Sequence, residues 1–352
     1  MKPEQKTLVI LTPGFPASEA DSTCLPMQQN FVKAIKENHP GLNIIILSFQ
    51  YPYFVKSYSW FGIQVMSFNG QNKPGLARQL LRMKLNSTLK KIHQAHSIAG
   101  IISFWYGECA WVGKRFADKN KLKHVCWILG QDARKNNKYV KQAGLKATEL
   151  VALSDFIQDE FERNYLVRPA FVIPPGIQID KSQTATKQKD IELLAAGSLI
   201  PLKQFEIFVE TVAEIKKTLP DVKAVLIGDG PEKNKLQALI AKHDLQSNIS
   251  LTGELAHSDV LQWMQSAKVF LHPSAYEGFG VVCIEALYVG CRVISFCKPM
   301  KQKIEHWDIV NNKDEMKEKA LGLLQDAGTD FTAALPFRMD DTVKKMLELF
   351  SI

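Results

Sequence analysis

The 352-residue sequence lacks the features that mark a membrane-spanning, disulfide-bonded or disordered protein. No apolar run is long enough to cross a bilayer, and the apolar stretch 7–12 is too short for a secretory signal. The six cysteines show no CxxC spacing, and no low-complexity tract occurs. Hydrophobic residues make up 46% and charged residues 23% of the chain, which is typical of a soluble globular protein. We therefore expect a cytoplasmic protein with neither a zinc site nor a disulfide framework.

The chain is longer than one hydrophobic core usually supports, so two domains are expected. Short apolar, β-branched runs alternate with longer amphipathic stretches, a pattern typical of parallel sheets with crossover helices. In the first half the pattern predicts strands at 8–11, 43–48, 100–104, 124–129, 149–153 and 170–173. In the second half it predicts strands at 191–196, 223–227, 249–252, 269–271 and 292–295, and helices at 204–218, 233–243, 258–266 and 279–288.

The fold class expected is α/β, with two Rossmann-like domains facing each other across a cleft, because open α/β sheets bind ligands beyond the carboxyl ends of their strands. The N-terminal domain is expected over residues 1–176 and the C-terminal domain over 177–335, with a polar linker or surface loop at 178–190. The last segment, 336–352, contains a predicted helix at 340–350. Its crossing back to the N-terminal domain is one alternative.

The segment 273–290, PSAYEGFGVVCIEALYVG, carries the most informative motif. It predicts a strand end, a glycine-bearing turn and a helix that begins near Phe279. Gly278 and Gly280 would let a ligand approach the backbone, and the helix start offers free N–H groups and a positive dipole end suited to a diphosphate. Glu277 and Glu285 flank this helix start, where carboxylates can accept hydrogen bonds from sugar and ribose hydroxyls.

The segment resembles the EGFGxxxxE signature of the retaining glycosyltransferases of family 4, which have the GT-B fold, and Glu277 and Glu285 match its two glutamates. The resemblance implies a metal-independent enzyme that transfers a sugar, with retention, from a UDP- or GDP-linked donor to a glycan or lipid-linked acceptor. It also implies a place in the biosynthesis of cell-surface polysaccharide or glycoconjugates, with no cofactor beyond the nucleotide sugar. Consistent with this, no DxD triplet, the metal site of many other sugar transferases, occurs in the chain.

Three further segments resemble the same family. In 197–203, GSLIPLK, Lys203 matches the lysine of the family's GRLxxxK loop, where arginine and lysine bind the donor diphosphate, but Ser198 replaces the arginine. The turn 226–231, LIGDGP, resembles the family's GxGP turn, and 251–256, LTGELA, corresponds to the loop whose backbone reads the nucleotide base. A dinucleotide fingerprint would need a third glycine, which the run after Gly230 lacks.

The resemblance assigns roles to individual residues. Glu277 would hold the transferred sugar, Glu285 the ribose, and Lys203 the leaving diphosphate. The catalytic residues expected are Glu277, Lys203 and Asp132. The residues expected to bind the nucleotide sugar are Gly14, Ser198, Lys203, Gly228, Gly230, Leu255, Glu277, Phe279, Gly280 and Glu285.

The first half resembles the family more loosely. Gly14 lies in the turn TPGF after the first predicted strand, where it would face the donor diphosphate. In ILGQDAR, at 128–134, Leu129 stands where many members carry a histidine, and Asp132 and Arg134 either line the cleft or cap a helix. Glu108 follows the end of a predicted strand and is a candidate for the acceptor site.

The net charge of +8 lies in the first half, since residues 1–180 carry 23 Lys and Arg against 13 Asp and Glu. The predicted helix 76–92 is basic and places Leu76, Leu80, Met83 and Ile92 at near-helical spacing. Such a helix either lies on an anionic membrane surface or simply covers the first sheet. The partners expected are the nucleotide-sugar donor and a glycan or lipid-linked acceptor. Peripheral contact with the inner face of an anionic membrane is also expected, and binding of nucleic acid is not.

Other classes of protein stay open at this stage. The Ser198 and Leu129 departures also suit a non-catalytic GT-B partner subunit or a sugar-binding protein. A nicotinamide-dependent dehydrogenase is disfavoured by the missing third glycine. A GT-B epimerase and a sugar phosphate synthase are alternatives among the enzymes.

Overall fold

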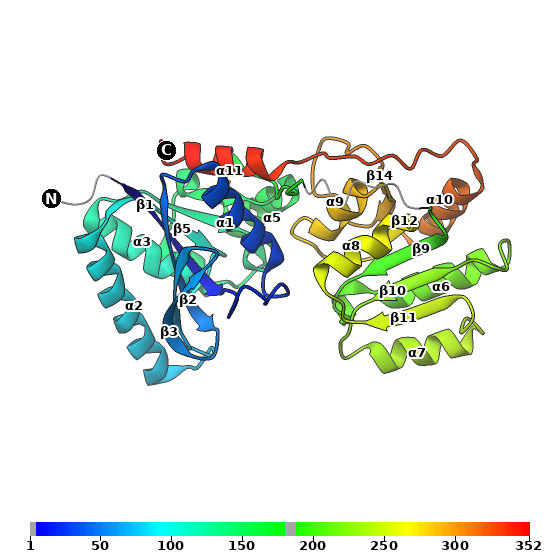
Figure 1. Ribbon diagram of the computed structural model, residues 1–352, viewed down its shortest axis with the longest axis horizontal. Helices are drawn as coiled ribbons and strands as arrows, with labels where there is room; N and C mark the ends of the chain where they lie inside the picture. The colour runs from blue at the N-terminus through cyan, green and yellow to red at the C-terminus, as the bar shows by residue number, and fades with distance from the viewer. Residues whose placement is uncertain (1–4, 180–187) are drawn as a thin grey trace. The chain divides into compact units, whose positions relative to one another are not determined.

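The computed structural model describes residues 5–179 and 188–352, so most of the polar segment 178–190 lies outside the described residues (Figure 1). The chain divides into two compact units. The first comprises the residues up to Gln178 together with Arg338–Ile352, and the second comprises Ile179–Phe337. The chain therefore leaves the first unit once and returns to it at its end.

The first unit is built on an eight-stranded sheet with the strand order β3-β4-β2-β1-β5-β6-β7-β8. All neighbours pair in parallel except β3, which is antiparallel to β4. The six strands expected from the sequence are present, while the β3–β4 hairpin was not expected. The strands are β1 (Lys6–Gly14), β2 (Asn43–Tyr51), β3 (Val55–Trp60), β4 (Ile63–Phe68), β5 (Ser97–Phe104), β6 (His124–Ile128), β7 (Leu150–Ala152) and β8 (Phe171–Val172).

Helices connect and flank these strands (Figure 1). They are α1 (Pro26–Asn38), α2 (Gly75–Ala95), α3 (Glu108–Asn120), α4 (Lys138–Ala143), α5 (Asp155–Tyr165) and α11 (Met339–Glu348), with short 3-10 turns at Gln131–Ala133 and Ala147–Glu149. Helix α2 buries Leu81, Leu85, Leu89 and Ile92, a spacing of three and four residues that keeps one face on the core. The grouping of Ile92 with Leu76, Leu80 and Met83 was wrong, because those three side chains lie on the opposite, exposed face.

The last helix, α11, packs on the first unit beside α1 (Figure 1). Asn38 of α1 donates a hydrogen bond to Asp340 at 2.9 Å, and the Thr342 hydroxyl donates to the carbonyl of Pro174 at 2.9 Å. The Phe350 ring covers Gly100 so closely that a Cβ there would lie 2.0 Å from the ring. The end of the chain is thus part of the first unit's structure.

The second unit is built on a six-stranded parallel sheet with the order β11-β10-β9-β12-β13-β14. The five expected strands and four expected helices are present, and β14 and α10 were not expected. The strands are β9 (Ile191–Ala196), β10 (Ala224–Ile227), β11 (Ile249–Gly253), β12 (Ala267–His272), β13 (Arg292–Ser295) and β14 (Trp307–Ile309). The helices are α6 (Phe205–Lys216), α7 (Lys233–Lys242), α8 (His257–Gln265), α9 (Val281–Tyr288) and α10 (Lys313–Gln325).

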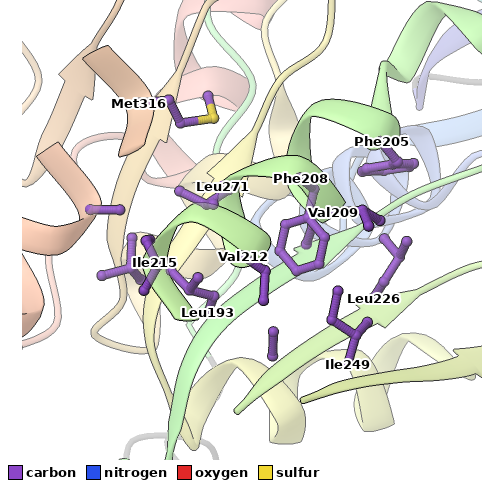
Figure 2. Close-up of a cluster of buried hydrophobic side chains, with 14 of the residues drawn as sticks. Leu193, Phe205, Phe208, Val209, Val212, Ile215, Leu226, Ile249, Leu271 and Met316 are labelled. Carbon is purple, nitrogen blue, oxygen red and sulfur yellow. The ribbon is translucent and has the colours of Figure 1, made fainter. Parts of the chain in front are cut away.

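Helix α6 anchors the core on one face of the second sheet (Figure 2). Phe208 and Val212 are fully buried against Leu193 of β9 and Leu226 of β10. Fully burying such a side chain contributes ~1.5–3 kcal/mol. This packing fixes the strands whose carboxyl ends carry the predicted motifs.

Two mostly parallel sheets flanked by helices confirm the expected α/β class with two Rossmann-like domains. Among residues 5–179 and 188–352, none of the helices combines the length and the apolar character needed to cross a membrane.

Candidate functional site

A cavity of about 300 Å³ lies in the second unit, where β9, β10 and β11 end. Four of the residues predicted to bind the donor line it: Ser198, Lys203, Gly228 and Leu255. The remaining lining residues are Ala196, Gly197, Ile227, Asp229, Glu254, Val260 and Val282. Four segments, at 196–203, 227–229, 254–260 and 282, therefore meet around one cavity.

The wall of the cavity depends on two glycines whose backbone conformations are rare for residues that have a side chain. Gly228 has φ +142°, and a Cβ there would lie 1.9 Å from the carbonyl oxygen of Gly197. Gly230 has φ +152°, and its Cβ would lie 2.6 Å from the carbonyl oxygen of Leu199. The amide of Leu199 also donates to the carbonyl of Asp229 at 2.9 Å. Both glycines are therefore required for the close packing of two loops.

Glu277 is the centre of a polar cluster beside the cavity. Its Oε1 accepts hydrogen bonds from Lys203 Nζ, from Ser274 Oγ at 2.9 Å and from His272 Nε2 at 3.2 Å. Lys203 ends the 3-10 turn that follows β9, and His272 is the last residue of β12. The amide of Ala275 donates to the carbonyl of Leu202 at 3.0 Å, which ties the two loops together. The sheet thus brings two of the three predicted catalytic residues into contact.

The electrostatics of this cluster keep the glutamate ionised. Burial alone would raise the pKa of Glu277, but the hydrogen bond from His272 and the positive charge of Lys203 outweigh it and lower that pKa to about 2. His272 is fully buried, and burial lowers its pKa, so the imidazole is neutral and its Nε2–H is the donor. The cluster therefore holds one carboxylate and one ammonium side by side.

Helix α9 begins at Val281, two residues later than the sequence suggested, because Gly280 with φ 83° is the N-cap. Within the described residues, no side chain caps this helix start, and Val282 in its first turn lines the cavity. Phe279 is 1% exposed and packs edge-on against Trp307 and Phe337. Its side chain anchors the turn in the core of the unit.

Glu285 lies in the second turn of α9 and is held by a residue from another helix. Its Oε1 is 2.8 Å from Nε2 of His257, the first residue of α8. This hydrogen bond raises the pKa of His257, although burial opposes the shift. The hydrogen bond to His257 therefore holds the carboxylate of Glu285 in place.

Two predicted residues belong to the first unit. Asp132 is 8% exposed, and its carboxylate accepts backbone hydrogen bonds from Tyr106 at 2.7 Å, Gly130 at 2.8 Å and Leu129 at 3.1 Å. Burial raises its pKa, and these hydrogen bonds oppose the shift. Asp132 lies within the 3-10 turn Gln131–Ala133, whose N-cap is Gly130, so its carboxylate ties that turn to the preceding strand end and does not cap a helix. Gly14 ends β1, where its carbonyl accepts a hydrogen bond from Thr12 at 2.7 Å.

Sequence reasoning missed the roles of Ser274 and His257. Ser274 lies three residues before Glu277, a spacing that could have indicated the contact. His257 is 28 residues from Glu285 and gives no local signal, since the contact depends on how α8 and α9 pack. Among the residues that the structure describes, no group of three or more His, Cys, Asp or Glu side chains is placed to hold a metal ion.

Comparison with known proteins finds a family match over most of the second unit. Residues 176–330 match the family model of the glycosyl transferases group 1. An uncharacterized glycosyltransferase of Methanocaldococcus jannaschii is 26% identical over 213 residues, which cover 58% of this chain and 58% of that protein. The GtfA subunit of the UDP-N-acetylglucosamine–peptide N-acetylglucosaminyltransferase of Streptococcus pneumoniae is 29% identical over 147 residues, or 42% of this chain and 29% of that protein. The matched parts thus span less than two thirds of these relatives.

The fold of the whole chain is similar to that of solved structures. Anabaena HepE, whose structure contains UDP and glucose, has a TM-score of 0.71 at 18% identity, covering 99% of this chain and 100% of that one. This likeness confirms the GT-B fold. Residues 176–330 match the group 1 glycosyltransferase model, while membership of family 4 and the roles of the two glutamates stay predictions.

Proposed function

We propose that this GT-B chain transfers a sugar from a nucleotide diphosphate donor to a glycan or lipid-linked acceptor, with retention of configuration and without a metal ion. The observation that carries the proposal is the cavity beyond β9, β10 and β11, where Ser198 and Lys203 meet the start of α9. The group 1 glycosyltransferase model covers all of these residues, which supports the proposal.

The donor diphosphate is proposed to lie between Lys203 and the first turn of α9. Bond cleavage leaves negative charge on the diphosphate, and the group that stabilises this charge lowers the barrier. Lys203 supplies a full positive charge, and the uncapped helix start supplies N–H groups and a positive dipole end. Ser198 supplies a hydroxyl where the family has an arginine, so the helix start takes a larger share of this work.

The sugar and the nucleoside are proposed to contact the two glutamates. Glu277, kept ionised by its cluster, would accept hydrogen bonds from the hydroxyls of the transferred sugar. Glu285, oriented by His257, would accept them from the ribose, and the backbone near Leu255 would face the base. A UDP-linked donor is the first choice, since the pneumococcal relative is named for UDP-N-acetylglucosamine and HepE binds UDP.

The proposal is tested by incubating the chain with UDP-, GDP- and ADP-sugars and measuring both the thermal shift and the release of nucleoside diphosphate. Lys203→Ala and Glu277→Ala should each lower turnover more than tenfold, or by at least ~1.4 kcal/mol of transition-state stabilisation. Lys242→Ala, an exposed lysine at the end of α7, is the matched control. Donor binding without release of nucleoside diphosphate would favour the non-catalytic alternative, and near-normal turnover in both site variants would refute the site assignment.

We also propose that α2 binds the inner face of an anionic membrane and that the chain reaches its acceptor there. Leu76, Leu80 and Met83 are 77%, 57% and 67% exposed and lie on one face, next to exposed lysines such as Lys84. An exposed apolar stripe bordered by positive charge suits a membrane interface. Vesicles with phosphatidylglycerol should bind the chain, Met83→Ser should weaken this binding, and the control Leu166→Ser, at a 91% exposed site, should not. Equal binding to neutral vesicles would refute the proposal.

A further inference from the structure

A separate cavity of about 220 Å³ lies within the first unit, where β2 and β5 end and α3 begins. Its lining combines charged, amide and aromatic side chains. They include Gln50, Arg78, Trp105, Glu108, Lys138 and Tyr139. Pockets that combine an apolar wall with a few convergent polar groups are the usual form of small-molecule sites.

The polar groups of this cavity are held by one another. Glu108 is 9% exposed, and its Oε1 accepts a hydrogen bond from Arg82 Nε at 2.6 Å. Its Oε2 accepts another from Gln50 Nε2 at 3.1 Å, and Gln50 Oε1 in turn accepts from the amide of Asn72 at 2.8 Å. Arg82 also donates to the Tyr139 hydroxyl at 3.3 Å. Such a network fixes the direction of each donor and acceptor before any ligand arrives.

Positive charge exceeds negative charge around the cavity. Glu108 is the acidic member, whereas Arg78, Arg82 and Lys138 are basic. Arg78 Nε is buried and finds no hydrogen-bond partner among the described residues, and its distance to Glu108 Oε1 is 3.9 Å. A buried N–H without a partner carries a desolvation cost, which is larger when the group is charged. An anion beside Arg78 would remove this cost.

The aromatic wall is held in an unusual conformation. Trp105 follows β5 with φ 63°, in the left-handed region that bulky residues rarely adopt. Its amide donates to the carbonyl of Trp127 at 3.0 Å, and its carbonyl accepts from the amide of Gly107 at 2.8 Å. Backbone strain of this kind persists only where the surroundings enforce it. Trp105 and Tyr139 both line the polar cavity.

We propose that this cavity binds the acceptor as a sugar that carries an anionic substituent, a phosphate or a carboxylate. The apolar face of the sugar ring packs on Trp105, its hydroxyls meet Gln50 and Glu108, and the anion pairs with Arg78 and Lys138. The inference rests on the proposed transferase function, because it names the class of acceptor. Arg78 has a specific role in it, since a charged, partly buried guanidinium distinguishes an anionic sugar from a neutral one.

Direct binding to the full chain tests the inference without any turnover. Glucose 6-phosphate, glucuronic acid, glucose and inorganic phosphate are titrated into the protein by isothermal calorimetry. At least one anionic sugar should bind tenfold or more tightly than glucose, and the better of the two shows whether the anion is a phosphate or a carboxylate. No binding of either, equal binding of glucose, or equal binding of inorganic phosphate would each overturn the inference.

Two variants locate the site. Arg78→Gln should weaken the binding of the anionic sugar at least tenfold, whereas Lys84→Gln, with the same charge change on an exposed position of the same helix, should not. If Arg78→Gln does not fold, Lys138→Gln serves instead, since Lys138 is exposed. Equal weakening by the Lys84 variant would overturn the site.

A thermal shift with UDP-glucose on the same samples separates the two proposals. Stabilisation by the nucleotide sugar without binding of an anionic sugar overturns only the acceptor inference. Binding of an anionic sugar without any nucleotide-sugar response supports the cavity and counts against the proposed transferase function.

Discussion

Replacing Glu277 by glutamine should change how the stability of the second unit depends on pH. The pKa of Glu277 falls from its ordinary value of 4.5 to about 2 in the folded chain. Because the pKa is lower in the folded state, the ionised carboxylate stabilises that state above pH 4.5, and this contribution is lost as the pH falls toward 2. The difference between 4.5 and about 2 is roughly 2.5 pKa units, and at ~1.36 kcal/mol per unit it stabilises the folded state by about 3 kcal/mol at neutral pH.

The size of the effect follows from the contacts of one oxygen. Glu277 and Lys203 are only 18% and 19% exposed, so solvent screens their interaction weakly. Glutamine keeps the shape of the side chain but cannot ionise, so the variant lacks this pH dependence. The stability gap between the wild-type chain and Glu277→Gln should shrink by ~2 kcal/mol between pH 7 and pH 3. Glu318→Gln, which changes an exposed carboxylate on α10 that lies outside this cluster, is the matched control.

The assay must report the second unit alone, because a chain of two units need not unfold in one step. Trp307 is 3% exposed, packs against Phe279 and donates to Ser295 Oγ at 2.8 Å. In a chain labelled with 5-fluorotryptophan, its fluorine resonance follows the urea unfolding of this unit. If the wild-type chain and Glu277→Gln differed in unfolding free energy by the same amount at both pH values, the prediction would be refuted. Lys203 and His272 would then not stabilise the ionised form of the carboxylate.

Two further changes test the walls of the same unit. Gly228→Ala should lower the free energy of unfolding by ~2–4 kcal/mol, because the new Cβ would lie 1.9 Å from the carbonyl oxygen of Gly197. The control Gly253→Ala, at φ +79° but with open space around the new Cβ, should lower it by only ~1–2 kcal/mol. Equal losses of the two variants in urea unfolding would contradict the clash. The pKa of His257 is raised by its hydrogen bond to Glu285, so its stabilising contribution is present at low pH and lost as the pH rises through that pKa. His257→Gln should therefore melt further below the wild-type chain at about pH 5.5 than at about pH 8.5, and a calorimetric gap that does not narrow would contradict this.

Much of the fold could be predicted because buried parallel strands have a strong signal. Strands such as β1 and β9 are short runs rich in leucine and other apolar residues, which is typical of parallel strands buried on both faces of the sheet. The β3–β4 hairpin gives no such signal. Its outer strand, VKSYSW, is mainly exposed at the edge of the sheet, and its turn places Phe61 at φ 45°. Edge strands of this kind are stabilised by their neighbour rather than by their own composition.

The candidate site could be predicted where short sequence motifs mark its residues. Ser198 and Lys203 lie in one short motif, and the structure brings both to one cavity. The contact of His257 with Glu285 could not be predicted, since it joins two helices whose packing no local pattern specifies. The catalytic role of Asp132 came from the resemblance of ILGQDAR to the family and stays a prediction, while its carboxylate accepts hydrogen bonds from backbone N–H groups two and three residues away, which no sequence pattern indicated.

The substitution of serine at position 198 makes the Lys203–Glu277 pair more important to the proposed mechanism. If an arginine stood at position 198 beside Lys203, one of these two cations could bind the diphosphate while the other contacted Glu277. Here Lys203 already contacts Glu277, so a diphosphate that approaches Lys203 competes with the carboxylate for the same ammonium. Glu277 then keeps its hydrogen bonds from Ser274 and His272 while its tie to the lysine weakens, and it becomes a better acceptor for sugar hydroxyls. Recognition of the phosphate and recognition of the sugar are thereby coupled through one side chain, so UDP should strengthen the binding of a free sugar to the wild-type chain but not to Lys203→Ala.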